Sequence, residues 1–170
     1  MWSSVDGAGG REDVVDLSSW SVGLSLIVLT IAIHTTAVVL MAFGLEARIR
    51  IRVGNHDPDL LRATPTVIGH IGAVALILAA LHGLEGVLWA TAYWWLGALD
   101  SLTDASVYSL ATMTTFEIPG LTLPRRFQMI SALEAVNGAL LFGISTAFVF
   151  AVMQVHWQVL SRRHGRTDGH

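Results

Sequence analysis

The chain has 170 residues, of which 53% are hydrophobic and 14% are charged, and its formal net charge is −3. The apolar residues come in long blocks, which is typical of an integral membrane protein and not of a soluble domain. The small negative charge gives no indication of nucleic-acid binding. The absence of cysteine excludes disulfides, thiolate metal sites and a cysteine nucleophile.

The first part of the chain predicts an acidic tail followed by a membrane span. Residues 1–19 are polar, and their charge has the wrong sign for a secretory signal peptide. The apolar block 20–45 exceeds the roughly 20 residues that a bilayer crossing needs. The next segment, 46–65, is expected to be a connector with a turn at Asp57-Pro58. It contains four arginines: Arg48, Arg50, Arg52 and Arg62.

Two further apolar blocks predict two more spans, so that the membrane domain covers residues 20–157. The second block, 66–99, ends in aromatic residues, as a helix at a membrane interface often does. The third block, 127–157, is followed by a basic tail at 158–170.

The stretch 100–124 lies between the second and third blocks and predicts a short helix followed by a loop. Ser101 and Asp104 form a helix start signal, and no glycine or proline follows until after Thr115. Pro119 and Gly120 then end any helix. We therefore expect an all-α integral membrane protein with three transmembrane helices and a re-entrant pore helix and loop between the second and third.

The arginines predict the orientation. Three crossings put the 46–65 connector and the C-terminal tail on the same side of the membrane. The positive-inside rule then places the N-terminus outside and the C-terminus in the cytoplasm of a cell (inner) membrane. Arg125 and Arg126 are exceptions, because they would lie outside.

A loop at membrane depth predicts an assembly, because non-helical backbone is tolerated there only inside protein or beside water. Three helices cannot enclose the loop, whereas a symmetric homotetramer could. Small residues recur every four positions in the second and third spans, which lets helices approach closely between subunits or within one. They are Ala75, Ala79 and Gly83, and Ala135, Ala139, Gly143 and Ala147.

The segment Tyr108-Ser109-Leu110-Ala111-Thr112-Met113-Thr114-Thr115 resembles the end of the pore helix in tetrameric potassium channels. In that family a Thr-x-Thr-Thr sequence precedes the filter Gly-Tyr-Gly-Asp. The third span, LEAVNGALLFGISTAFVFAVMQ, and part of the second, HGLEGVLWATAYWWLGAL, look like helices of small bacterial channel-like proteins. The resemblance implies an ion-conducting homotetramer with the third span lining the axis.

The chain departs from that family at the filter, where it has Glu117-Ile118-Pro119-Gly120. Glu117 and Pro119 do not favour the backbone angles that glycine permits. Four Glu117 carboxylates could form a ring that attracts monovalent or divalent cations. Alternatively, the protein is a non-conducting scaffold or sensor that keeps the pore fold. The predicted pore and filter residues are Thr112, Thr114, Thr115, Phe116, Glu117, Ile118, Pro119 and Gly120.

Ionisable side chains within spans are functional candidates. His82 and Glu85 share a helix face and could bind a metal, relay protons, or simply lock helix packing. His34 could complete a metal site, which leaves a metal- or haem-binding membrane protein as a third reading.

Glu134 and Asn137 share a face of the third span. Glu134 could brace the pore loop, pair with His82 or Arg125, or line a pore or proton path. No enzyme motif appears in the sequence, so we expect neither catalysis nor a cofactor.

Overall fold

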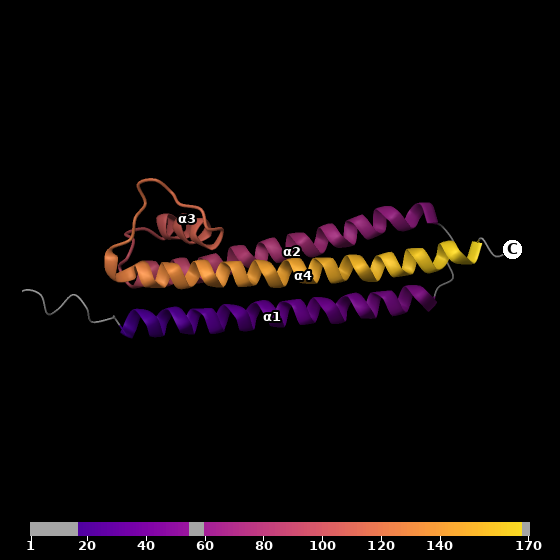
Figure 1. Ribbon diagram of the computed structural model, residues 1–170, viewed down its shortest axis with the longest axis horizontal. Coiled ribbons are helices and arrows are strands. Elements are labelled where there is room, and N and C mark those ends of the chain that lie inside the picture. Colours follow the sequence, from indigo (N-terminus) through magenta and orange to yellow (C-terminus); the bar gives the residue numbers. More distant parts are fainter. Residues whose placement is uncertain (1–16, 55–59, 168–170) are drawn as a thin grey trace, which may run out of the picture.

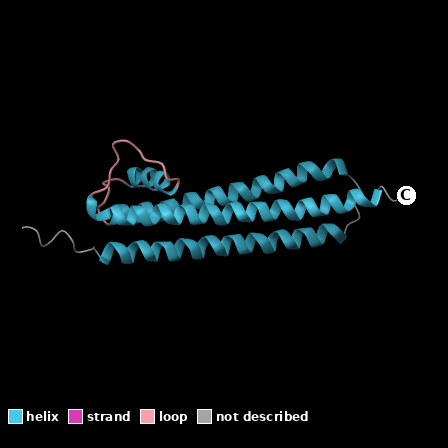
Figure 2. Cartoon of the chain, in the orientation of Figure 1, coloured by secondary structure: helices cyan, strands magenta, loops and turns pink. Residues whose placement is uncertain are grey.

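The computed structural model describes residues 17–54 and 60–167, and this part of the chain is helical with no strands (Figures 1 and 2). The chain forms helix α1 (Leu17–Gly54), helix α2 (Leu60–Trp95), the short helix α3 (Leu102–Met113), a 3₁₀ turn (Arg125–Phe127) and helix α4 (Gln128–Thr167). Most of the predicted N-terminal tail, the Asp57-Pro58 turn and the last three residues lie outside the described residues.

Helices α1, α2 and α4 run side by side along the length of the molecule, and α3 lies at the end where α1 and α4 begin (Figure 1). Helix α1 packs mainly on α4, whereas α3 packs on both α2 and α4. The long helices contain three windows that are long and apolar enough to cross a membrane. They are Trp20–Ala47, Val67–Trp95 and Arg125–Val155. The predicted all-helical chain with three helices long and apolar enough to span a membrane is therefore confirmed.

The long helices extend beyond the predicted spans. Helix α1 continues to Gly54, and α2 begins at Leu60, so most of the predicted 46–65 connector is helical. Helix α4 likewise continues to Thr167, through most of the predicted basic tail. The change from apolar to basic residues marks the end of the apolar window, but arginine is a good helix former and does not end a helix.

Helix α2 ends at Trp95, earlier than the predicted limit near residue 99. The amide of Ala98 donates to the Tyr93 carbonyl at 2.9 Å and that of Gly97 to the Trp94 carbonyl at 3.1 Å. Gly97 has a φ of 66°, so this is a helix C-terminal motif with glycine in the left-handed position. The chain can turn there without strain and begin α3 a few residues later.

Helix α3 begins as the sequence predicted. Ser101 has an extended backbone, and its Oγ accepts a hydrogen bond from the amide of Asp104 at 3.0 Å.

An aromatic-rich core lies beneath this end of the molecule, where the residues that join α2, α3 and α4 are buried together. It contains Trp89, Ala90, Tyr93, Ala98, Ala105, Leu123, Phe127 and Ile130.

Candidate functional site

The C-terminal end of α3, at Met113, packs closely on the backbone of α4. A Cβ atom added to Gly138 would overlap the main chain of Met113, with its Cα only 2.8 Å away. At about 1.5 Å per residue, the stretch of α4 from Gln128 to Gly138 is about 15 Å long. Met113 therefore lies beside the middle of the apolar window Arg125–Val155. From there, the chain returns to the end of the bundle where α4 begins (Figure 1).

Thr115, two residues beyond the end of α3, has a conformation that usually requires glycine. The amide of Phe116 donates to the Ala111 carbonyl at 2.8 Å and that of Thr115 to the Thr112 carbonyl at 2.9 Å. This pattern places Thr115 in the left-handed region, with a φ of 57°. For a residue with a Cβ atom this conformation costs about 1–2 kcal/mol. The strain lies within the predicted pore segment, as is common at functional sites.

The predicted filter segment forms a tight turn. The amide of Leu121 donates to the carbonyl of Ile118 at 3.2 Å, and Gly120 has a φ of 86°. Proline at the second position and glycine with positive φ at the third are the signature of a type II turn, here made by Pro119 and Gly120. The predicted pore residues adjoin one another at the end of α3 and in this turn. Of these, Thr114, Thr115, Phe116, Glu117, Pro119 and Gly120 are exposed in the single chain, and Thr112 and Ile118 are half-buried.

Glu134 is fully buried and joins α2, α3 and α4. The Tyr93 hydroxyl donates to its Oε2 at 2.6 Å, and the Ser109 hydroxyl lies in a very short hydrogen bond with its Oε1. Ser109 also lies 2.8 Å from the Gly86 carbonyl oxygen of α2. Glu134 thus holds α3 through Ser109, a side chain of that helix. The partners that the sequence suggested for Glu134, His82 and Arg125, do not make these bonds.

Asn137, which the sequence groups with Glu134, contacts a different helix. Its Nδ2 donates to Thr30 Oγ1 of α1 at 2.9 Å. The Thr30 hydroxyl in turn donates to a carbonyl within α1, that of Leu26, at 2.8 Å. Asn137 therefore ties α1 to α4, and the loop is not its partner in these contacts.

A second buried polar cluster joins α1, α2 and α4. His34 Nδ1 lies 3.0 Å from Glu85 Oε1, and His82 Nδ1 lies 3.4 Å from Glu85 Oε2. Ser145 Oγ of α4 lies 3.0 Å from His34 Nε2 and 3.1 Å from His82 Nε2. His34 and Glu85 are fully buried, and the ring of Phe142 stacks on His82 with centroids 4.4 Å apart. The structure thus brings together the three residues that the sequence offered as metal-ligand candidates.

The sequence interpretation missed Ser109 and Ser145 as partners of these clusters, although both lie on periodic helix faces. Glu134, Asn137, Leu141 and Ser145 recur at intervals of three and four, and all four are buried. A polar residue continuing such a face is a signal that could have identified Ser145. No comparable signal relates Ser109 to Glu134, because their contact depends on how α3 lies against α4.

Comparison with known proteins gives no relative. No protein-family model, curated protein or solved structure matches the chain. The function must therefore be inferred from the chain's own residues and their arrangement.

Proposed function

We propose that the chain is a cation channel-like membrane protein with the pore architecture of tetrameric potassium channels and an altered filter. The observation that carries this proposal is the contact between Met113 and Gly138. Because α2 and α4 contain apolar spanning windows, this contact supports a position at membrane depth for the C-terminal end of α3. A short helix entering between two spanning helices, followed by a returning loop, is the arrangement expected of a pore helix.

The polar loop supports assembly around an axis. In the described part of the chain, the amides of Glu117 and Gly120 donate to no backbone carbonyl, and both residues are exposed. Such groups are not tolerated against lipid at membrane depth, so they need protein or water around them. Four copies with their loops facing a common axis would supply both, which is why we propose a homotetramer.

The small residues of α4 support the same assembly. Ala139, Gly143 and Ala147 are exposed in the single chain, and a Cβ atom on Gly143 would meet open space. Within the described residues this stripe therefore packs against no helix, although small residues favour close helix contact. A second copy of the chain is the partner that we propose for it, with α4 lining the axis.

The chemistry at the end of α3 favours cations. The C-terminal end of a helix carries partial negative charge, and here it is directed toward the middle of the span. Glu117 follows within a few residues and would add one carboxylate per subunit. The tight turn at Pro119 and Gly120 differs from a ladder of inward-facing carbonyls, so we propose cation attraction by charge and not potassium selectivity.

We further propose that the end holding α3 faces the outside of a cell (inner) membrane. Arg48, Arg50 and Arg52 lie in the last part of α1, at the end opposite α3. The positive-inside rule places that end, together with the C-terminus, in the cytoplasm.

Ion flux through the reconstituted protein tests the proposal. We expect the parent to conduct cations and Glu117→Gln to reduce the flux several-fold, because the axis loses its carboxylates. Glu46→Gln, at the far end of α1, is the matched control and should leave flux unchanged. Equal flux in Glu117→Gln and the parent would contradict the proposed ring of Glu117 carboxylates. A parent without flux would favour the non-conducting scaffold or sensor.

A further inference from the structure

The cluster of His34, His82, Glu85 and Ser145 lies outside the proposed pore segment, and its hydrogen-bond count is incomplete. Four close contacts link these side chains: each histidine places Nδ1 near a Glu85 oxygen and Nε2 near Ser145 Oγ. Two neutral imidazoles and one hydroxyl supply three protons, while an ionised carboxylate supplies none. In those protonation states, at least one of the four contacts brings two lone pairs together.

The structure identifies the contact that lacks a proton. Three of the four have hydrogen-bond geometry, whereas His82 Nδ1 and Glu85 Oε2 face each other at 3.4 Å and neither has a hydrogen-bond partner. Both atoms are buried, and Glu85 has no exposed surface at all. A buried carboxylate in a spanning helix is costly unless a positive charge compensates it. The cluster therefore has an electrostatic need for a cation.

We propose that His34, His82 and Glu85 bind a divalent transition-metal ion, with Zn²⁺ as the first candidate. At Zn–N and Zn–O distances of about 2.0–2.1 Å, tetrahedral ligands lie about 3.3 Å apart. His34 Nδ1 lies 3.0 Å from one oxygen of Glu85 and His82 Nδ1 lies 3.4 Å from the other, so each histidine is already near that separation from the carboxylate. All three ligand atoms lie within 4.8 Å of one another, so a small movement of one imidazole would bring them to the separation of tetrahedral ligands.

Ser145 has the position of a residue that orients metal-binding histidines. Metal-bound imidazoles usually donate their second N–H to a neighbouring oxygen, which fixes the ring and its tautomer. Both Nε2 atoms lie at hydrogen-bond distance from Ser145 Oγ, which has two lone pairs and can accept from both. With the metal on the Nδ1 side, the contacts on the Nε2 side are complete.

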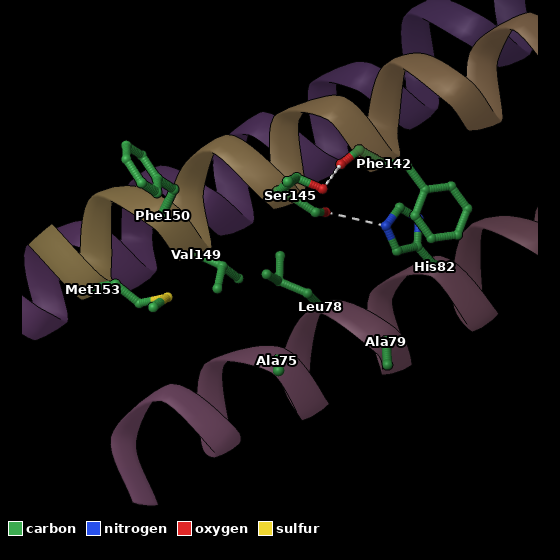
Figure 3. Close-up of a pocket in the computed structure, with 10 residues that line it drawn as sticks. Ala75, Leu78, Ala79, His82, Phe142, Ser145, Val149, Phe150 and Met153 are labelled. Atoms are coloured by element: carbon green, nitrogen blue, oxygen red, sulfur yellow. Dashed lines mark hydrogen bonds between the residues drawn. The ribbon is translucent and has the colours of Figure 1, made fainter. Parts of the chain in front are cut away.

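A cavity between α2 and α4 adjoins the Ser145 side of the cluster. The cavity has a volume of about 430 Å³, and His82 and Ser145 are among its lining residues. In Figure 3, these two side chains point toward one another across the space between the two helices. The rest of the lining is mainly apolar, including Leu78, Phe142 and Val149. A water molecule as the fourth ligand would complete a four-coordinate site whose protein ligands come from α1 and α2.

Metal content and a spectroscopic probe test this site in the full-length protein, purified without a polyhistidine tag. After treatment with a chelator, incubation with Zn²⁺ and desalting, we expect about one Zn²⁺ per chain. Co²⁺ in place of Zn²⁺ should give the intense visible absorption of a four-coordinate ion. A parent that retains no Zn²⁺ and gives no Co²⁺ band would overturn the proposal and leave a proton as the missing cation.

Variants locate the metal. Glu85→Gln and His82→Gln should weaken Zn²⁺ binding at least tenfold, since each removes a ligand. Ser145→Ala should weaken it by about 10–100-fold without removing a ligand, as loss of an orienting partner typically does. His70→Gln and Glu134→Gln are the matched controls and should bind like the parent. Equal binding by the parent and the cluster variants would mean adventitious metal. If those variants fail to fold, the Co²⁺ spectrum of the parent decides.

Discussion

Gly138→Ala is expected to destabilise the protein by about 1–3 kcal/mol, as overpacking of a closely packed contact does. The added methyl group would overlap the main chain of Met113, and backbone atoms cannot rotate away as a side chain can. The change should therefore push α3 off α4. Thermal unfolding in detergent would measure the loss, and faster proteolysis within residues 114–124 would locate it.

Gly72→Ala is the matched control for this prediction. It makes the same change in helix α2, at a position outside the proposed subunit contact, and its new Cβ atom meets open space. Replacing glycine by alanine in a helix gains up to about 1 kcal/mol of helix propensity, so Gly72→Ala should be neutral or slightly stabilising. Equal destabilisation by both substitutions would contradict the close packing of α3 on α4.

Glu134→Ala is expected to cost about 3 kcal/mol, since it leaves a buried hydroxyl without its partner and opens a cavity. Tyr93 has no exposed surface, and its hydroxyl donates to Glu134 at 2.6 Å. The hydroxyl of Ser109 retains the Gly86 carbonyl, 2.8 Å away, as a partner. The loss should therefore act mainly through Tyr93 and loosen the joint between α2, α3 and α4.

A double-mutant cycle with Tyr93→Phe separates this hydrogen bond from the general cost of removing a side chain. Contacting residues typically show coupling of about 0.5–3 kcal/mol, and we expect Glu134 and Tyr93 to fall in that range. Thr30→Val is the control, because Thr30 bonds Asn137 of α4 instead. Its effect should add to that of Glu134→Ala. Coupling near zero between Glu134 and Tyr93 would show that the bond contributes nothing to stability.

The sequence predicts the helices of this chain well, because each leaves a local signal. Three apolar blocks identify the helices with spanning windows, and the Ser101–Asp104 pair identifies the start of α3. The ends of α1 and α4 were less predictable. A run of arginines marks where apolar residues stop, but a helix can continue beyond that point, as α1 does to Gly54.

The partners of the buried polar side chains could be predicted only in part. Spacing places His82 and Glu85 on one face of α2, but it carries no information on how α1 is rotated or at what depth it lies. The contact of His34 with Glu85 depends on both. Likewise, the position of Glu134 in the chain predicts that it lies near the loop. Its partner Ser109 cannot be predicted, because spacing does not tell how α3 lies against α4.

The central claim is that several copies of this chain surround a common axis with their 114–124 loops facing it. Native mass spectrometry of the detergent-purified protein tests it most directly. We expect a mass four times that of one chain, because a single chain leaves the polar loop and the stripe at Ala139, Gly143 and Ala147 exposed. A protein that remains monomeric in mild detergent and in lipid nanodiscs would contradict the account.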